Sequence, residues 1–390
     1  MKDIKTVVDW LAGGATSAAR SEDVLGQLCE RMLECGLPLW RVAVFVNTLH
    51  PDIMGRSFVW QVQSGVKVSA APFAMMQTAT YLDSPVVAVY ASRQPIRRHI
   101  ADPNCPDDFP ILRDLRAEGA TDYAAFPLVF FDGAIHVATW STQQPGGFTP
   151  KQFSDLGSVI APLARVAEIR ALRRTAENLL ETYVGHQTGE KILAGKIRRG
   201  YVEAIRAAIW LSDMRGFTTL SERLPPQDLI DLLNRYFGAQ VPAILDHGGE
   251  VLKFMGDGLL AIFPIADDAD ADAVCRRALA CAREVETRIA ELPRKRESEA
   301  TRFRLALHSG EVMYGNIGGG NRLDFTCIGP AVNLAARLEK IAGRLHRTIV
   351  ASAGFARICQ SQWSDLGEFP IAGFSKAERV YGLQDETPAG

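Results

Sequence analysis

Two aspartates in the second half of the chain stand where apolar runs end or turn. Asp213 ends the run AAIWLS, and Asp257 lies between two glycines inside the apolar run VLKFMGDGLLAIF. The Gly-Asp-Gly step predicts a tight β-hairpin, and an aspartate at its tip is by itself most simply a turn residue. If the two runs form neighbouring strands, however, the two carboxylates meet at one edge of a sheet. Adjacent carboxylates either raise the pKa of one member or hold a hard cation with phosphate oxygens, so this pair predicts a metal–phosphate site.

A lysine lies in the same apolar run as the second aspartate. Lys253 precedes Asp257 by four residues, which at ~3.3 Å per residue separates the two by roughly 13 Å on one face of the sheet. They therefore do not form an ion pair with each other. A lysine in an apolar strand must reach a buried acceptor or extend its amine to solvent, so Lys253 needs a separate explanation.

A third set of polar residues follows a proline that suits the first turn of a helix. Asn333 and Arg337 come three and seven residues after Pro330 and then share one helix face near its N-terminus. An amide beside a guanidinium could bind a ribose and an anionic phosphoryl group. The alternative is a surface arginine that pairs with Glu339 or with solvent.

The composition is typical of a soluble globular protein of two domains. The chain has 390 residues, of which 47% are apolar and 23% charged, and its formal net charge is −2. That charge gives no long-range attraction to nucleic acid or anionic membranes, so we expect small molecules or another protein chain as partners.

Seven cysteines without a C-x-x-C pair indicate neither a disulfide framework nor a zinc site. Because no apolar segment approaches the ~20 residues that span a bilayer, we expect no membrane span and a cytoplasmic location.

The elements that must position these residues fall into three zones: a first domain at 1–162, a linker at 163–200 and a second domain at 201–385. The first domain has an α+β pattern. Its predicted helices lie at 22–35 and 150–170, and its predicted strands at 40–46, 57–60, 86–90, 124–131 and 135–140, the last two joined by a D-G hairpin.

The linker has apolar or small residues at a spacing close to 3.5, which is typical of a parallel dimer helix. These positions are Val166, Ile169, Ala176, Leu180 and Tyr183. An ordinary amphipathic helix packed on the first domain is the alternative.

The second domain alternates strand and helix signals in the order β-α-β-β-α-β, which predicts a ferredoxin-like fold. The strands are expected at 207–212, 251–263 (a hairpin), 302–308, 311–317, 323–328 and 348–351, and the helices at 226–246, 268–292 and 331–342. The glycine-rich residues 315–320 lie between strands without a following helix, so we expect a turn there rather than a phosphate-binding loop.

Three segments of the second domain carry a family resemblance. They read LSDMRGFTTLSERL, HGGEVLKFMGDGLLAIFP and ALHSGEVMYGNIGGGNRLDFTCIGPAVNLAARLE, in that order. Together they resemble the catalytic domain of class III nucleotidyl cyclases, the adenylate and guanylate cyclase family. The resemblance implies that Asp213 and Asp257 bind two Mg²⁺ or Mn²⁺ ions per site. It also implies that Asn333 orients the ribose and that Arg337 stabilises charge on the α-phosphate.

Further roles follow from the same resemblance. Lys253 falls where the family reads the purine, and Thr326 falls at the second base-reading position. A lysine donor and a hydroxyl suit N1 and the 6-amino group of adenine, which favours ATP over GTP. Adenylate members often have aspartate at the second position, and Thr326 instead resembles a threonine-bearing subset, some members of which respond to bicarbonate. The resemblance also places the backbone of Met214 near a metal and makes Lys376 the nearest candidate for a late phosphate-binding lysine.

The family builds each site from two protomers, with the metal aspartates on one and the base-reading, ribose and phosphate residues on the other. Since this chain has both sets, the resemblance implies a homodimer with two complete sites that converts ATP to 3′,5′-cyclic AMP and pyrophosphate. Residues 178–200 resemble the helix-turn element that precedes such domains. The alternatives are a guanylate cyclase and a catalytically silent cyclase-like protein that binds nucleotide or only dimerises.

The first domain resembles a GAF domain, a sensor module, in its element order, its D-G hairpin and its closing helix. We expect it to receive an unknown small-molecule or redox signal that regulates the second domain. His50, His99 and His136 have no metal-ligand spacing, and Cys29 and Cys35 lie on different helix faces, so these five are expected to be structural.

Overall fold

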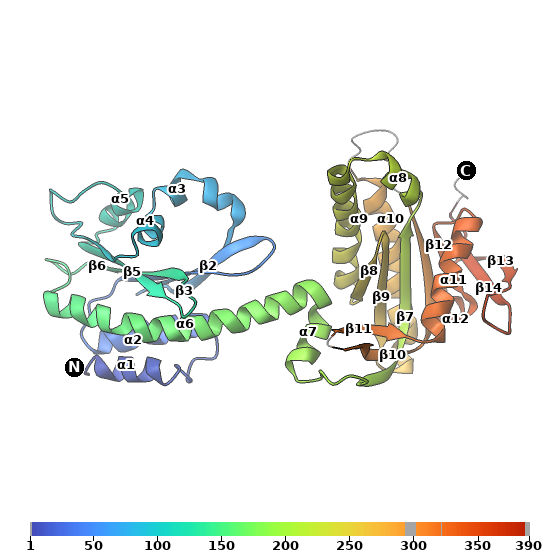
Figure 1. Ribbon diagram of the computed structural model, residues 1–390, viewed down its shortest axis with the longest axis horizontal. Helices are drawn as coiled ribbons and strands as arrows, with labels where there is room; N and C mark the ends of the chain where they lie inside the picture. Colours follow the sequence, from blue (N-terminus) through green and yellow to red (C-terminus); the bar gives the residue numbers. More distant parts are fainter. Residues whose placement is uncertain (1, 293–301, 321, 387–390) are drawn as a thin grey trace. The chain divides into compact units, whose positions relative to one another are not determined.

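The computed structural model describes residues 2–292, 302–320 and 322–386. The chain forms two compact units, Met1–Leu179 and Leu180–Gly390, and each of them packs helices against a β-sheet (Figure 1). Within the described ranges, no helix is long and apolar enough to cross a bilayer. All seven cysteines of the chain lie in these ranges and are free thiols.

The first unit is built on a six-stranded sheet in the order β3-β2-β1-β6-β5-β4. Every neighbouring pair is antiparallel. Along β1, Val42 and Val44 face one hydrophobic core while Phe45 packs against the other, as strand alternation requires. The strands are β1 (Arg41–Asn47), β2 (Ile53–Gln61), β3 (Gly65–Pro72), β4 (Ile96–Arg98), β5 (Asp122–Val129) and β6 (Ile135–Thr142).

Helices cover both faces of this sheet (Figure 1). One face packs against α1 (Lys5–Ala12), α2 (Ser21–Glu34) and the long α6 (Pro150–Val184). The other face carries η1 (Phe73–Gln77), α3 (Ala79–Leu82), α4 (Pro85–Ser92) and α5 (Pro110–Ala117).

Most of the strands and helices predicted for the first unit are confirmed, but the strand predicted at 86–90 is wrong. Those residues form α4, because Ser84 caps the helix by accepting a hydrogen bond from the backbone of Val87 (3.3 Å) and Pro85 occupies its first turn. By strand propensity alone, the valines of residues 86–90 favour a strand over a helix. The predicted D-G hairpin is confirmed, since Asp132 accepts a hydrogen bond from the backbone of Ala134 (2.9 Å).

The predicted closing helix and the predicted linker helix form one continuous element, α6, which ends at Val184 and is followed by Gly185 with φ +86°. α7 (His186–Leu193) follows. Of the expected seam positions, Val166 is buried in the core of the first unit, whereas Ile169 and Tyr183 are 64% and 80% exposed. Ala176 and Leu180 are half-buried. One predicted seam position thus packs in the core of the first unit, and only Ile169 and Tyr183 of the five are exposed.

The second unit is built on an eight-stranded sheet in the order β13-β14-β12-β10-β7-β9-β8, with β11 paired to β10. The central order β10-β7-β9-β8 and the connection by two helices confirm the ferredoxin-like β-α-β-β-α-β prediction. The strands are β7 (Val202–Met214), β8 (Glu250–Met255), β9 (Gly258–Ile265), β10 (Phe303–Gly319), β11 (Arg322–Ile328), β12 (Ile349–Ser352), β13 (Trp363–Phe369) and β14 (Glu378–Leu383).

Two long helices, α9 (Pro226–Asp246) and α10 (Ala271–Ala290), pack on one face of this sheet, and α11 (Pro330–Arg344) packs on the other. A 3₁₀ turn, η2 (Asp268–Asp270), precedes α10. Two short helices, α8 (Phe217–Arg223) and α12 (Ala353–Ile358), complete the unit.

The two strands predicted at 302–308 and 311–317 are one strand, β10, which corrects that prediction. Ser309 and Gly310 pair with Ala208 and Ala207 of β7, so the ladder runs through the expected break. Gly310 is needed for packing rather than for a turn, because a Cβ there would lie 2.8 Å from the Cβ of Ala331. The turn predicted at 315–320 is also mostly wrong, since 315–319 belong to β10 and only Gly320, at φ +58°, is outside the strand.

A buried network of hydrogen bonds joins α7 to strands β8 and β10 within the second unit. The Thr188 hydroxyl donates to the Glu250 carboxylate (2.9 Å), and the Tyr314 hydroxyl donates to the same carboxylate (2.8 Å). All three side chains are buried, so breaking one bond leaves a costly unpaired group. These hydrogen bonds therefore hold α7, which follows α6, against β8 and β10.

Candidate active site

The structure brings the two sequence-predicted aspartates together at one edge of the second sheet. Asp213 lies near the end of β7, and Asp257 lies in the tight turn between β8 and β9, where Gly256 has φ +68°. β7 and β9 pair antiparallel with Ser212 opposite Leu259, which sets the turn beside the end of β7.

The Asp213 carboxylate affects the protonation of Asp257. Burial, together with the hydrogen bond and charge of Asp213, raises the pKa of Asp257 to about 6. The buried Met214 acts in the opposite direction, since its backbone hydrogen bond to Asp257 favours the ionised form. A desolvated pair of like charges at a sheet edge is a site where a cation would be strongly stabilised.

An arginine that the sequence analysis missed faces this pair. Arg304 stands directly opposite Asp213 in the β10–β7 ladder, and its guanidinium donates to the Asp213 carboxylate. The same guanidinium forms an ion pair with Glu339 of α11 (2.7 Å). Only the strand register places Arg304 here, because nothing in its sequence neighbourhood links it to a residue 91 positions earlier.

The two base-reading candidates lie near one another on β8 and β11. The amine of Lys253 forms an ion pair with Asp324 (3.4 Å). The acceptor that the lysine reaches is thus a carboxylate on the protein surface. Asp324 and Thr326 are two residues apart on β11 and point to the same face of the strand. Thr326 is buried, and its hydroxyl has no hydrogen-bond partner in the part of the chain that the structure describes.

Asn333 and Arg337 are both exposed on one face of α11, as the sequence predicts. The alternative in which Arg337 pairs with Glu339 is wrong, because Glu339 is buried and binds Arg304. Lys376 lies in an exposed loop between β13 and β14. Across residues 2–292, 302–320 and 322–386, no hydrogen bond or ion pair joins Lys253, Asn333, Arg337 or Lys376 to the two aspartates.

The donor set at the two aspartates fits a hard divalent cation. It consists of carboxylate oxygens, which Mg²⁺ prefers, and Mg²⁺ in proteins is commonly held by one or two carboxylates plus substrate phosphates. Among the described residues there is no group of three or more His, Cys, Asp or Glu side chains that could hold a metal by themselves. A cation at Asp213 and Asp257 would thus take its remaining ligands from substrate or water.

Comparison with known families and proteins agrees with this geometry. Residues 203–384 match the family described as adenylate and guanylate cyclase catalytic domain. Adenylate cyclase 1 of Rhizobium meliloti is 32% identical over 179 residues, which is 44% of this chain and 26% of that protein. An uncharacterized protein of Mycobacterium tuberculosis is 32% identical over 372 residues, which is 89% of this chain and 61% of that protein. This chain therefore spans less than two thirds of either relative.

Two solved structures each match about half of the chain. The adenylyl cyclase CyaB from P. aeruginosa is 27% identical, with a TM-score of 0.41 over 48% of this chain and 99% of that one. The guanylyl cyclase Cya2 is 27% identical, with a TM-score of 0.40 over 47% of this chain and 93% of that one.

Replacing Arg304 by methionine should destabilise the second unit by about 3 kcal/mol, because buried Glu339 then loses its cation and Asp213 its neighbour. Adding Glu339→Gln should recover part of that loss. The measurement is the free energy of unfolding in denaturant. The matched control, Arg276→Met, removes an exposed ion pair with Asp272 (2.9 Å) and should cost at most about 1 kcal/mol. Equal losses for the two arginine variants would contradict the role given to Arg304.

Proposed function

Because residues 203–384 form a catalytic domain of the adenylate and guanylate cyclase family, we propose that this chain is an adenylate cyclase. It converts ATP to 3′,5′-cyclic AMP and pyrophosphate at two sites of a homodimer. The observation that carries this proposal is the pair of adjoining carboxylates, Asp213 and Asp257, at the edge of the domain's sheet. The seven free cysteines fit action in a reducing compartment, the cytoplasm.

Asp213 and Asp257 hold two Mg²⁺ or Mn²⁺ ions in this proposal. When bound, these ions lower the pKa of the ribose 3′-hydroxyl and neutralise the triphosphate. Met214 is buried at the end of β7, and in this proposal its backbone lies near one of the ions. Arg304 supplies the positive charge that holds Asp213 in place while no substrate is bound.

The remaining residues orient the substrate for an in-line displacement. The 3′-hydroxyl gives up its proton to water, the bond from the 3′-oxygen to the α-phosphorus forms as the bond from the α-phosphorus to the β-phosphate oxygen breaks, and pyrophosphate leaves. Arg337 offers a planar multi-donor guanidinium to the charge that develops on the α-phosphate, and Asn333 hydrogen-bonds the ribose. Both side chains are exposed on α11 and free to meet a substrate. Lys376, on its exposed loop, is the candidate ligand of the terminal phosphates.

Lys253 and Thr326 select the base. The lysine amine donates to N1 of adenine, and the threonine hydroxyl accepts from the 6-amino group. The hydroxyl of Thr326, buried and without a hydrogen-bond partner among the described residues, supports this role, because such a group gains a full hydrogen bond when a ligand supplies one. Guanine presents an acceptor at O6 and a donor at N1, which this pair matches less well.

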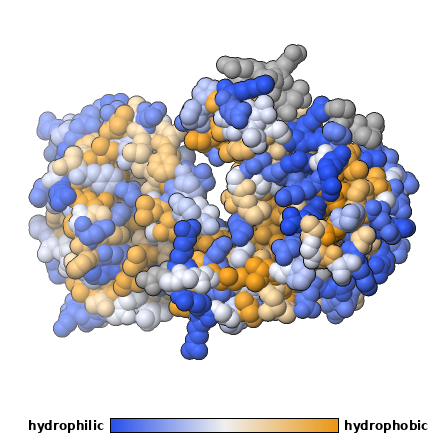
Figure 2. Space-filling model, turned by 45° about the vertical axis from the view of Figure 1, so that its right-hand side comes forward, coloured by the Kyte–Doolittle hydropathy of each residue, from blue (hydrophilic) through white to orange (hydrophobic). Residues whose placement is uncertain are grey.

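Exposed apolar side chains near Lys253 and Thr326 support the proposed homodimer. Phe254 and Met255, next to Lys253, are 53% and 42% exposed, and Leu323 and Ile328 on β11 are 39% and 49% exposed. Apolar residues gather in patches on the visible surface of the molecule (Figure 2). Such patches mark surfaces that another chain covers. A second copy of this chain is the simplest occupant, since it would supply the missing half of each site.

The open part of the α6 seam supports a parallel pairing of the same two chains. The seam residues Ile169 and Tyr183 are large, apolar and exposed, and so is Leu172, which lies outside the predicted seam on the same helix. Packing them against their counterparts would remove that surface from water and set the two catalytic domains in register.

Asp257→Asn should lower cyclic AMP formation with Mn²⁺ by a factor on the order of a hundred or more, because it removes one of the two metal carboxylates. Product formation by chromatography measures the effect, and circular dichroism checks the fold. Asp272→Asn changes a half-exposed aspartate on α10, away from the two carboxylates in the sequence, and as the matched control it should retain activity. Full activity in Asp257→Asn would refute the metal assignment.

Mixing protomers tests whether the sites are shared. Asp257→Asn and Arg337→Ala are each expected to be inactive, but a mixed dimer has one intact site. At full subunit exchange, half of the dimers are mixed, so activity should return to about a quarter of the unmodified value. A mixture of Asp257→Asn with Asp213→Asn, which both damage the metal half, should stay inactive. No recovery in confirmed mixed dimers would rule out a shared site.

Lys253→Glu should lower the ratio of ATP use to GTP use by about tenfold or more, because an acceptor replaces the donor that faces adenine N1. The measurement is kcat/KM for each nucleotide. Lys67→Glu changes another strand lysine in the first unit and should leave the ratio unaltered. If the ratio also stays the same in Lys253→Glu, Lys253 does not read the base.

A further inference from the structure

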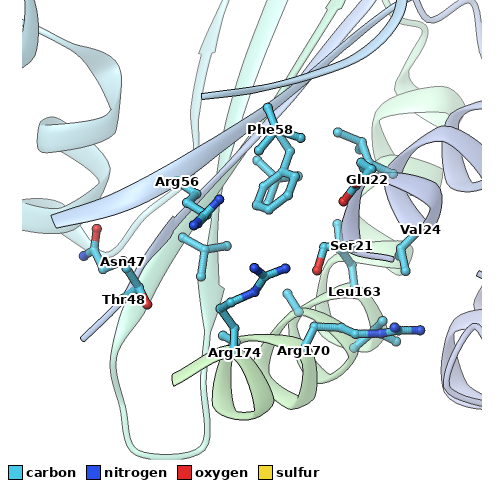
Figure 3. Close-up of a pocket in the computed structure, with 17 residues that line it drawn as sticks. Ser21, Glu22, Val24, Asn47, Thr48, Arg56, Phe58, Leu163, Arg170 and Arg174 are labelled. Atoms are coloured by element: carbon cyan, nitrogen blue, oxygen red, sulfur yellow. The ribbon is translucent and has the colours of Figure 1, made fainter. Parts of the chain in front are cut away.

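The first unit contains a cavity of about 330 Å³ between its sheet and helices α2 and α6 (Figure 3). Strands β1, β2 and β3 form its floor, and all of its lining residues lie between Ser21 and Arg174. This volume falls at the lower end of the range of small-molecule sites. The cavity is thus large enough for a compact ligand.

The walls of this cavity are mainly apolar. Phe58 and Val68 face it from the sheet, and Leu25, Leu163 and Val166 face it from the helices. All five belong to the apolar lining that would exclude water from the body of a ligand. A ligand made only of charged or hydrated groups would leave this surface unused.

Positive charge is concentrated at one side of the same cavity. The guanidinium groups of Arg56 and Arg174 both point into it (Figure 3). Arg56 lies on an interior strand, and its Nε is buried without a hydrogen-bond partner in the described part of the chain. Within residues 2–292, 302–320 and 322–386, the interaction of Arg174 is a long ion pair with Glu177 (3.9 Å). Both therefore retain donors that an anion could take up.

The other charged groups of the lining do not neutralise these two. Arg170 donates to the backbone carbonyls of Ala18 and Ala19 (2.6 Å each). Among the described residues that line the cavity, Glu22 is the acidic one, and it forms an ion pair with Arg20 (3.2 Å), which is outside the lining. The lining thus has an excess of positive charge.

We propose that this cavity binds a small organic anion. Its apolar body packs between the sheet and α6, and its carboxylate or phosphate head accepts hydrogen bonds from Arg56 and Arg174. Such a ligand contacts α6, the helix that continues to Val184 beyond the end of the first unit. The cavity is therefore the place where we expect the first unit to receive a signal. The binding site does not depend on the proposed cyclase activity.

Calorimetric titration of the full chain with three probes tests the chemistry of the site. Phenylbutyrate has an apolar body and a carboxylate, phenylbutanol has the same body without charge, and inorganic phosphate has charge without the body. Phenylbutyrate should bind at least about tenfold more tightly than either control, because only it uses both the apolar wall and the arginines. Equal affinity for the alcohol, or no binding of phenylbutyrate at millimolar concentration, would overturn the proposal.

Variants then place the binding in this cavity. Arg56→Gln and Arg174→Gln should each weaken phenylbutyrate binding by about tenfold or more, since each removes a charged hydrogen bond. Arg173→Gln is the matched control: its side chain is 78% exposed on the same helix, and it should bind as the unmodified chain does. If all three variants bind alike, the ligand binds elsewhere.

Two further variants separate folding and activity from binding. Ala171→Leu adds bulk at the cavity wall without changing charge, so it should also weaken binding while thermal unfolding stays cooperative. Asp257→Asn, in the second unit, should bind phenylbutyrate like the unmodified chain. Loss of binding in Asp257→Asn would contradict a self-contained site in the first unit, whether or not the chain is a cyclase.

Discussion

The antiparallel pairing of β7 with β9 on one side and β10 on the other determines the chemistry of the second unit. Ser212 lies opposite Leu259, so the β8–β9 turn lies beside the end of β7. Asp213 lies opposite Arg304, so the guanidinium of that β10 residue faces the carboxylates. The pairing forces two like charges together in a partly desolvated place, which raises the pKa of Asp257 to about 6. A shift of either strand by one residue would turn these side chains to the opposite face of the sheet.

The strands and helices of the second unit also place the other predicted site residues apart from the two aspartates. Lys253 and Thr326 are brought near one another by β8 and β11, and Asn333 and Arg337 share the outer face of α11. Neither pair is bonded to the carboxylates within the described chain, while apolar side chains beside them remain exposed. In the function proposed above, a second copy of this chain completes an arrangement that needs both halves, and the exposed apolar side chains of α6 would pair the two copies.

Much of this could be predicted from the sequence where local pattern and fold agree. The helix at 226–246, the Gly-Asp-Gly hairpin and the meeting of Asp213 with Asp257 follow from periodicity and turn chemistry. The helix α4 was mistaken for a strand because its valines outweighed the Ser-Pro start signal, and β10 was divided because Ser309-Gly310 has the composition of a turn. Arg304 could not be found in this way, since its position depends on the register of distant strands. The cavity of the first unit is likewise assembled from three strands and two helices, which no local pattern reports.

The most direct measurement is product formation by the purified, dimeric chain with Mn²⁺, supplied with ATP and GTP separately and analysed by chromatography. We predict cyclic AMP from ATP and far less cyclic GMP from GTP, because Lys253 and Thr326 match the hydrogen-bonding edge of adenine. Cyclic GMP as the main product would contradict the assignment of the base. The absence of any cyclic product, in a chain shown to be dimeric, would contradict the catalytic role of the Asp213–Asp257 pair.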